Sequence, residues 1–197
     1  MSLLAILRRQ GIILVAVAVS LLLFGFVAWY FGVRVWRNNT ESMPLGWYIF
    51  WPSHDPRRGD IVAACPPGEE RTLGLERGYL GPGPCNGAAN LLKIVAGIPG
   101  DLVVVTNAGV CINGHHLSHS ARLQWDQKHR PVPQIPSGQF RIPPGGYWLA
   151  SPHPASWDSR YYGPLSAGNI TYEGHPLSLI VYPPIIDSEV CGRSLLY

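Results

Sequence analysis

Apolar residues form one continuous run near the N-terminus and only short runs after it. Gly11 to Val33 contains no charged residue. At about 1.5 Å per residue, a helix of this length spans the roughly 30 Å hydrocarbon core of a bilayer. The run ends in Trp29, Tyr30 and Phe31, aromatic residues typical of a membrane interface. The pattern predicts one N-terminal transmembrane helix.

A cleaved secretory signal is the alternative interpretation of this run. Such a signal has an apolar core of about 7–15 residues and a small-residue cleavage site. The longer run and its aromatic end favour a permanent anchor. Arginines flank both ends, Arg8 and Arg9 before the span and Arg34 and Arg37 after it, so the positive-inside rule barely discriminates. The short N-terminus favours N-terminus inside and the remaining chain outside.

Beyond the anchor, the pattern is that of a β-protein. Short runs rich in Val, Ile and aromatic residues are bounded by turn-forming residues, and Asn113-Gly114 is a hairpin signal. Closely spaced prolines argue against a long amphipathic helix after Arg37. We expect Pro66–Asn90 to be an irregular insertion and the chain after Pro184 to be a loose extension. The expected strands are Trp47–Trp51, Asp60–Ala64, Leu91–Ala96, Leu102–Thr106, Tyr147–Ala150 and Leu177–Tyr182.

Composition narrows the function classes. Charged residues make up 14% of the chain and the net charge is +3, without a long basic run, which argues against nucleic-acid binding. Lysine is scarce. Lys128 lies in a polar loop and is interpreted as ordinary surface, whereas Lys93 lies within an apolar strand pattern.

Four cysteines occur without a C-x-x-C pair, so zinc-ligand spacing is absent. An even number on the outside of a membrane suggests disulfides, and four cysteines allow three connectivities. Cys65 with Cys85 is the preferred pair because it would close the Gly/Pro-rich insertion; four buried thiols are the alternative. His115, His116 and His119 lack acidic or cysteine partners at ligand spacing, so neither a metal nor another cofactor is expected.

Three segments could carry chemistry. Ser42 precedes Met43-Pro44, where a regular helix is disfavoured. A lysine buried in a strand has a depressed pKa and can act as a general base, although an edge-strand lysine that reaches solvent is the alternative for Lys93. The third segment, Ser156 to Pro164, combines hydroxyls, a carboxylate and a guanidinium. A turn with a structural ion pair is equally compatible with it.

Taken together, these segments resemble the signal peptidase I family of membrane-anchored peptidases with a Ser–Lys dyad. The resemblance rests on Ser42-Met43-Pro44, on Lys93 followed by Gly97-Ile98-Pro99-Gly100-Asp101, and on Asp158-Ser159-Arg160-Tyr161-Tyr162-Gly163-Pro164, in order behind an anchor. It extends to about Pro183. It implies a mainly β fold, a signal-peptidase-like antiparallel sheet domain with one N-terminal transmembrane helix.

The resemblance also implies roles for single residues. Ser42 is the expected nucleophile and neutral Lys93 its general base. The Ser42 N–H and the Thr40 hydroxyl would hold the oxyanion, and Ser156 would orient the lysine amine. Asp158 is expected to be essential, either by acting on the dyad or by anchoring Arg160, and both interpretations remain open.

Within the family, the chain looks like the conjugative-transfer, TraF-like branch. Ser151-Pro152-His153-Pro154 replaces the Gly-Asp-Asn-Arg stretch of general leader peptidases, whereas Arg77-Gly78-Tyr79-Leu80-Gly81-Pro82-Gly83 and Gly109-Val110-Cys111-Ile112-Asn113-Gly114 match the branch. By resemblance, the substrate is a conjugative pilin precursor, and cyclisation of the product stays open. The expected partners are that precursor, the bilayer and other type IV secretion components, with no nucleic acid.

The resemblance places the chain in the bacterial inner membrane, with a single span and a periplasmic catalytic domain. The expected organisation is an N-terminal stub and anchor at 1–36, a peptidase domain at 37–184 and an extension at 185–197. A general signal peptidase I and an inert membrane-tethered scaffold of a secretion complex remain as alternatives.

Overall fold

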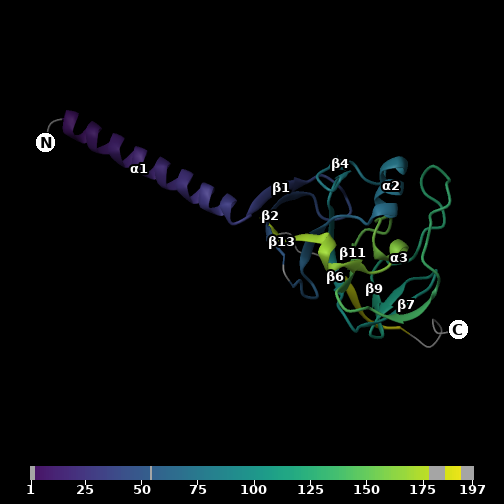
Figure 1. Ribbon diagram of the computed structural model, residues 1–197. Coiled ribbons are helices and arrows are strands. Elements are labelled where there is room, and N and C mark those ends of the chain that lie inside the picture. The colour runs from purple at the N-terminus through teal and green to yellow at the C-terminus, as the bar shows by residue number, and fades with distance from the viewer. Residues whose placement is uncertain (1–2, 54, 178–184, 192–197) are drawn as a thin grey trace.

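The computed structural model describes residues 3–53, 55–177 and 185–191, and shows one long helix followed by a β domain (Figure 1). The helices are α1 (Leu3–Tyr30), α2 (Gly68–Arg77), α3 (Ser159–Tyr162) and the 3-10 helix η1 (Ala167–Asn169). The strands are β1 (Arg34–Asn38), β2 (Gly46–Pro52), β3 (Ile61–Ala64), β4 (Pro82–Gly83), β5 (Gly87–Ala88), β6 (Leu91–Gly97), β7 (Leu102–Val105), β8 (Val110–Ile112), β9 (His115–Leu117), β10 (Gly138–Arg141), β11 (Gly146–Ala150), β12 (Leu165–Ser166), β13 (Ile170–Pro176) and β14 (Ile186–Val190).

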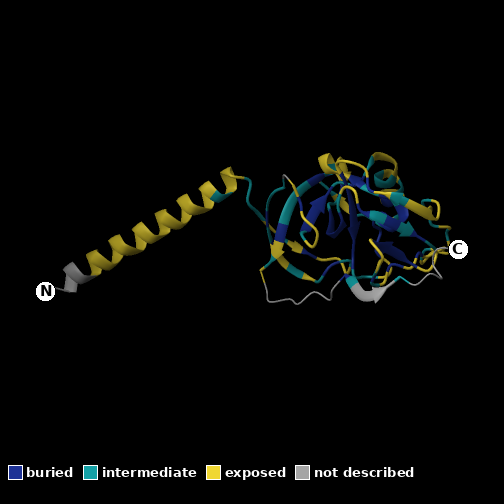
Figure 2. Cartoon of the chain, turned by 90° about the horizontal axis from the view of Figure 1, so that it is seen from below, coloured by how far each residue is buried: buried dark blue, intermediate teal, exposed yellow. Residues whose placement is uncertain are grey.

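Helix α1 projects away from the sheets, and its surface is exposed along most of its length (Figure 2). The segment Leu7–Tyr30 has a mean hydropathy of 2.8 and none of it is buried inside the protein. A helix of this length and composition could span a membrane. Only residues 31–33 separate it from β1, so the chain passes almost directly from this helix into the sheet.

The larger sheet has seven strands in the order β1-β2-β13-β3-β6-β11-β12, all paired antiparallel. Strand β6 lies between β3 and β11 and is buried along its whole length. Strands β1 and β2 form a hairpin at one edge, where Trp36 stacks on Phe50 with ring centroids 3.6 Å apart. This hairpin connects α1 to the part of the sheet that holds β6.

The smaller sheet has five strands in the order β10-β7-β8-β9-β14. One apolar cluster joins the two sheets, with Phe50, Ile94 and Trp148 from the larger sheet and Val103 and Ile112 from the smaller one. A second cluster, which includes Val95 and Leu149, covers the opposite face of the central strands. Strand β6 therefore has a core on both faces, and any polar side chain on it must be desolvated.

Most of the expected strands are present. Those at Trp47–Trp51, Asp60–Ala64, Leu91–Ala96, Leu102–Thr106 and Tyr147–Ala150 correspond to β2, β3, β6, β7 and β11. Asn113 (φ 53°) and Gly114 (φ 85°) form the predicted hairpin turn between β8 and β9. Of the expected strand Leu177–Tyr182, residues 178–182 lie outside the described part of the chain.

The prediction that Pro66–Asn90 is irregular is wrong. The segment contains the ten-residue helix α2 and the short β4–β5 pair. Glu69 and Glu70 lie in the first turn of α2, where carboxylates are favoured by the helix dipole, and Gly78 ends the helix in the left-handed conformation. A disulfide joins Cys65, directly after β3, to Cys85 and so fixes both ends of this segment.

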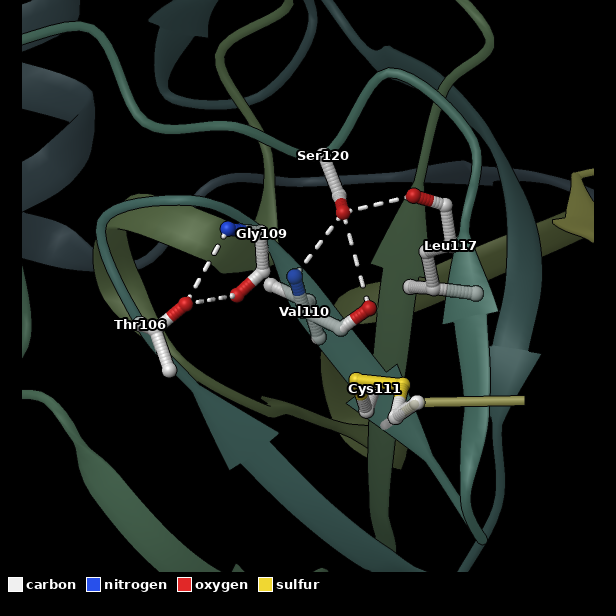
Figure 3. The surroundings of a disulfide bond; sticks show 7 residues. Thr106, Gly109, Val110, Cys111, Leu117 and Ser120 are labelled. Carbon is white, nitrogen blue, oxygen red and sulfur yellow. Dashed lines mark hydrogen bonds between the residues drawn. A yellow bond between two sulfur atoms is a disulfide. The ribbon is translucent and has the colours of Figure 1, made fainter. Parts of the chain in front are cut away.

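The prediction of a loose extension after Pro184 is also wrong for the described residues that follow it. Strand β14 pairs with β9, and a second disulfide joins Cys111 to Cys191. Figure 3 shows this bond beside the buried Ser120, whose hydroxyl donates to the Leu117 carbonyl and accepts from the Val110 N–H. All four cysteines are thus in disulfides, and none is a thiol.

Candidate active site

Ser42 lies in the loop that joins β1 to β2. The register Asn38↔Gly46 closes this loop at the end of the hairpin. Met43 is completely buried beneath it, whereas Ser42 itself is only half-buried. The buried methionine holds the loop against the core while the serine hydroxyl stays accessible.

Asn38, the last residue of β1, organises the Ser42 loop through its side-chain amide. Its Nδ2 donates to the carbonyls of Thr40 (2.9 Å), Met43 (2.7 Å) and Pro44 (3.1 Å). Its Oδ1 accepts from the N–H and from the hydroxyl of Thr40. One buried side chain therefore fixes the backbone on both sides of Ser42, a role that the sequence analysis missed.

The Thr40 hydroxyl lies between Asn38 and Ser42. It is 2.9 Å from Asn38 Oδ1, to which it donates, and 3.2 Å from Ser42 Oγ. Because a hydroxyl has one proton, the Ser42 hydroxyl donates to Thr40 in this arrangement. Thr40 can serve as an oxyanion donor only after its proton turns away from Asn38. Within the described residues, the Ser42 N–H has no acceptor and is free to bind an oxyanion.

Ser151 approaches the same loop from the other side. This fully buried residue follows directly after β11, and its hydroxyl donates to the Ser42 carbonyl. β11 pairs with β6 through Ala150↔Ile94, so the contact connects the Ser42 loop to the strand that carries Lys93. Ser151 is a second residue that the sequence analysis did not identify.

Lys93 is the one described lysine or arginine on β6, and only 2% of its surface is exposed. Its Nζ donates to Ser156 Oγ at 2.8 Å. In the described structure, Nζ makes no hydrogen bond to Ser42. Instead, the two side chains line one cleft of about 1210 Å³, together with Thr40 and Ser156.

Burial lowers the pKa of Lys93 from its ordinary 10.5 to about 8. The negative charge of Asp158 opposes this shift, and the positive charge of Arg160 adds to it. At pH 7, about one amine in ten is then neutral, against about one in several thousand for an ordinary lysine. The cleft thus holds an amine that can accept a proton near neutral pH.

Asp158 and Arg160 form a buried ion pair. Arg160 Nε donates to Asp158 Oδ1 at 2.8 Å and Nη2 to Oδ2 at 2.9 Å, with both side chains almost fully buried. Asp158 also caps α3 by accepting from the Arg160 N–H, and Arg160 donates to the carbonyls of His119 and Pro154. The pair supports the loop that carries Ser156. Among the described residues, neither member of the pair makes a hydrogen bond to Lys93.

The structure brings Thr40, Ser42, Lys93 and Ser156 to one cleft, and the charges of the buried pair Asp158 and Arg160 act on Lys93. Lys128 is exposed, as expected for a surface residue, and it also lines the cleft. Among the described residues, no group of three or more histidine, cysteine or acidic side chains is placed to hold a metal ion. Among the side chains that line the cleft are the Ser42 hydroxyl and the Lys93 amine.

A family model described as signal peptidase, peptidase S26, matches residues 6–175, from the apolar helix into β13. The chain belongs to this family. The match agrees with the resemblance noted in the sequence, and the observed fold is the expected one, mainly antiparallel β-sheet behind one apolar N-terminal helix. Membership in the signal peptidase family makes the chain a peptidase-type hydrolase.

Several curated relatives of this chain are named as transfer proteins. The plasmid transfer protein TraF of Escherichia coli is 37% identical over 175 residues, 84% of this chain and 93% of that protein. The conjugal transfer protein TraF of Agrobacterium fabrum is 38% identical over 140 residues, 68% and 75% of the two chains. A solved signal peptidase I from Enterococcus faecalis has 22% identity and a TM-score of 0.34, covering 59% of this chain and 94% of that one.

If Lys93 is the base, activity should depend on pH in a defined direction. Only the neutral amine accepts a proton, so kcat/KM should rise with pH through about 8 and level off above it. The measurement is kcat/KM for one precursor peptide from pH 5.5 to 10. A profile that is flat over this range, or that falls between pH 7 and 9, would contradict a lysine base.

Asn38→Ala should lower kcat about tenfold with little change in KM, because the Ser42 loop loses its internal hydrogen bonds while the cleft walls remain. Asn169→Ala is the matched control, since the Asn169 amide also donates to a backbone carbonyl, that of Cys65, but does not line the cleft. Equal kcat losses in the two variants would show that Asn38 contributes only to folding.

Proposed function

We propose that this chain is a membrane-anchored serine endopeptidase with a Ser42–Lys93 dyad that removes the signal peptide from a conjugative pilin precursor. Membership in the S26 family supports the peptidase class. The names of the TraF relatives support a role in conjugation. An apolar helix beside the catalytic domain agrees with a single span in the inner membrane and a periplasmic domain.

The observation that carries this proposal is the burial of the Lys93 amine at the catalytic cleft. A charged ammonium is costly to bury, and the structure gives this one a hydroxyl rather than a carboxylate as its hydrogen-bond partner. A neutral amine in that position can take the Ser42 proton, as serine needs an adjacent base for attack. No histidine is required for this chemistry.

The reaction then follows in two steps. Ser42 Oγ attacks the scissile carbonyl as Lys93 Nζ accepts its proton, and the Ser42 N–H binds the developing oxyanion. Lys93 returns the proton to the leaving amine, which leaves an acyl group on Ser42. Water, activated by neutral Lys93, hydrolyses this ester. A cyclic product needs a different scissile bond. Ser42 would attack a carbonyl near the C-terminus of the pilin and expel a short C-terminal peptide, and the free N-terminal amine of the pilin would then displace Ser42 from this acyl group and close the ring.

The decisive experiment is mass spectrometry of a pilin precursor co-expressed with the wild-type protein or with Ser42→Ala. The wild type should give a pilin that is shorter than the precursor. If this product is cyclic, its mass should be lower by one water molecule than that of the linear chain with the same terminal residues. Ser42→Ala should leave the precursor intact. Processing that persists in Ser42→Ala and in Lys93→Ala would refute the peptidase assignment and favour an inert scaffold, whereas cleavage of many secretory precursors would favour a general signal peptidase.

Exposed apolar side chains on the β1–β2 hairpin and its loop offer a contact with the membrane. Met43 and Phe50, from the same stretch of sequence, are fully buried and belong to the core. Leu45, which precedes β2, is 56% exposed, and Trp47, the second residue of β2, is 55% exposed. Exposed apolar side chains on a hairpin that directly follows a membrane helix are typical of an interfacial contact.

Replacing Trp47 with serine in the full-length protein should therefore lower kcat/KM about threefold to tenfold for a precursor embedded in liposomes. For a short soluble peptide the variant should equal the wild type, because Trp47 lies outside the set of side chains that line the cleft. Identical losses for both substrates would show that Trp47 stabilises the domain rather than contacts lipid.

A further inference from the structure

The insertion between Cys65 and Cys85 has no part in the dyad chemistry, yet it builds one wall of the catalytic cleft. The disulfide fixes its two ends, and α2 lies within it. Arg77 and Tyr79, at the end of α2, line the cleft. In Figure 1, α2 lies on the side of the domain away from α1, so this wall is remote from the membrane helix.

A loop from the other side of the cleft is tied to this wall. Arg77 Nη1 donates to the Pro131 carbonyl at 2.6 Å, and Arg130 Nη2 donates to the Arg77 carbonyl at 3.0 Å. The Arg130 guanidinium also lies over the Tyr79 ring, 6.0 Å from its centre. These contacts hold two guanidinium groups at one end of the cleft.

The local carboxylate, Asp126, is already fully occupied. It accepts from Arg130 Nε, from the Tyr79 hydroxyl and from the N–H groups of Lys128 and Arg130. Burial favours its neutral form, but these hydrogen bonds together hold the pKa of Asp126 below its usual range. The negative charge of Asp126 is therefore paired with Arg130. Among the described residues, the Arg77 guanidinium donates only to the Pro131 carbonyl and the Tyr79 hydroxyl, so its positive charge is not paired with a carboxylate.

The side chains that line the whole cleft carry a net positive charge. Two carboxylates, Glu41 and Asp126, line it, against six lysine and arginine side chains. By contrast, residues 34–197 as a whole are nearly neutral. The positive side chains that line the cleft are Arg34, Arg37, Arg77, Lys93, Lys128 and Arg130.

Aromatic side chains connect this end of the cleft to the dyad. Trp157 follows Ser156, the partner of Lys93, and its ring lies 5.3 Å from that of Tyr79. Tyr79 in turn donates to Asp126. A peptide bound at Ser42 can therefore extend along Trp157 and Tyr79 toward Arg77.

We propose that Arg77 and the adjacent Arg130 form a subsite for a carboxylate of the substrate, several residues from the scissile bond. The proposal deepens the peptidase function and rests on it. The carboxylate is supplied by an aspartate or glutamate side chain or by a free C-terminus. The insertion would then select among precursors, while the dyad cleaves them.

The test uses synthetic peptides that contain an apolar segment and an Ala-Xaa-Ala cleavage site, assayed with the full-length protein in detergent micelles. One set is amidated at the C-terminus and carries a single Glu or Gln at successive positions on both sides of the site. A second set has neutral side chains and ends in either an amide or a free acid. These arms distinguish a side-chain carboxylate from a terminal one.

In the wild type, we expect Glu over Gln at one remote position, or acid over amide at the C-terminus, to raise kcat/KM about threefold to tenfold, mainly through KM. Arg77→Gln should abolish the preference and Arg77→Lys should restore most of it. Arg71→Gln is the matched control, because Arg71 is on the same helix but does not line the cleft, and it should keep the preference. Salt at about 0.5 M should weaken it.

Equal rates for every Glu and Gln pair and for both termini would overturn the subsite, and so would a preference that survives in Arg77→Gln. Binding of the same peptides to Ser42→Ala, followed by fluorescence anisotropy, separates this outcome from failure of the proposed function. Tighter binding of the acidic peptide without cleavage by the wild type would refute the peptidase and keep the subsite. Cleavage without any charge preference would support the peptidase and refute the subsite.

Discussion

Replacing Lys93 with methionine is expected to reduce precursor cleavage by about 10⁴-fold. Methionine has a similar length and no proton acceptor of the required strength, so Ser42 loses its base while the strand keeps its packing. The free energy of unfolding should be unchanged or higher, because burial of the amine, which lowers its pKa to about 8, is unfavourable to the charged form. The measurements are single-turnover cleavage rates and thermal unfolding.

Two further variants make this result specific. Lys93→Arg keeps a positive charge that cannot be removed near neutral pH, and it should be as inactive as Lys93→Met. The double variant Ser42→Ala with Lys93→Met should be no slower than either single one, because two groups that act as a unit are not additive. More than about a tenth of wild-type activity in Lys93→Met would exclude Lys93 as the base.

Replacing Arg160 with methionine is expected to destabilise the domain by about 3–5 kcal/mol, since it leaves the buried Asp158 carboxylate without its partner. The carbonyls of His119 and Pro154 also lose a donor. Chemical denaturation of the full-length protein in detergent measures the effect. Arg58→Met is the matched control, because the Arg58–Asp101 pair has a similar separation of 2.6 Å but is a third exposed on the arginine side, and it should cost about 1 kcal/mol or less.

Asp158→Asn separates the two roles considered for this carboxylate. Asp158 raises the pKa of Lys93 and Arg160 lowers it, so loss of the negative charge should move the pH profile of kcat/KM to lower pH. If Asp158 acts only through Arg160 and Lys93, the variant should be destabilised, with a shifted profile and appreciable activity at its new optimum. An activity loss of about 10³-fold or more, with normal stability and an unshifted profile, would indicate direct participation.

Local patterns in the sequence predicted the strands of the core but not the elements that depend on distant partners. Runs such as Leu91–Ala96 are apolar enough to be strands in any context. Strand β14 exists because β9 pairs with it, and nothing in Ile186–Val190 alone indicates that pairing. Helix α2 had local signals, since Pro67, Glu69 and Gly78 mark its ends, but its polar composition concealed them.

The same distinction holds for the candidate site. Ser42 and Lys93 stand out because a family motif and an unusual position in an apolar strand mark them. Asn38 and Ser151 act through contacts to backbone carbonyls, which any residue provides. Asn38 lies four residues before Ser42, and an asparagine side chain often bonds to the backbone of a turn, which is a signal that could have drawn attention to it. For Ser151 the sequence holds no comparable signal, because its contact spans 109 positions along the chain.

The place of β14 has a consequence for the order in which the protein matures during synthesis. Every strand of the larger sheet, with Lys93 and the Ser42 loop, has been translated by Pro176. The smaller sheet lacks its outer strand until Val190 has followed, and Cys111 finds its partner only one residue later. A nascent chain therefore contains every residue that lines the catalytic cleft before the outer strand of the smaller sheet and Cys191 have been synthesised.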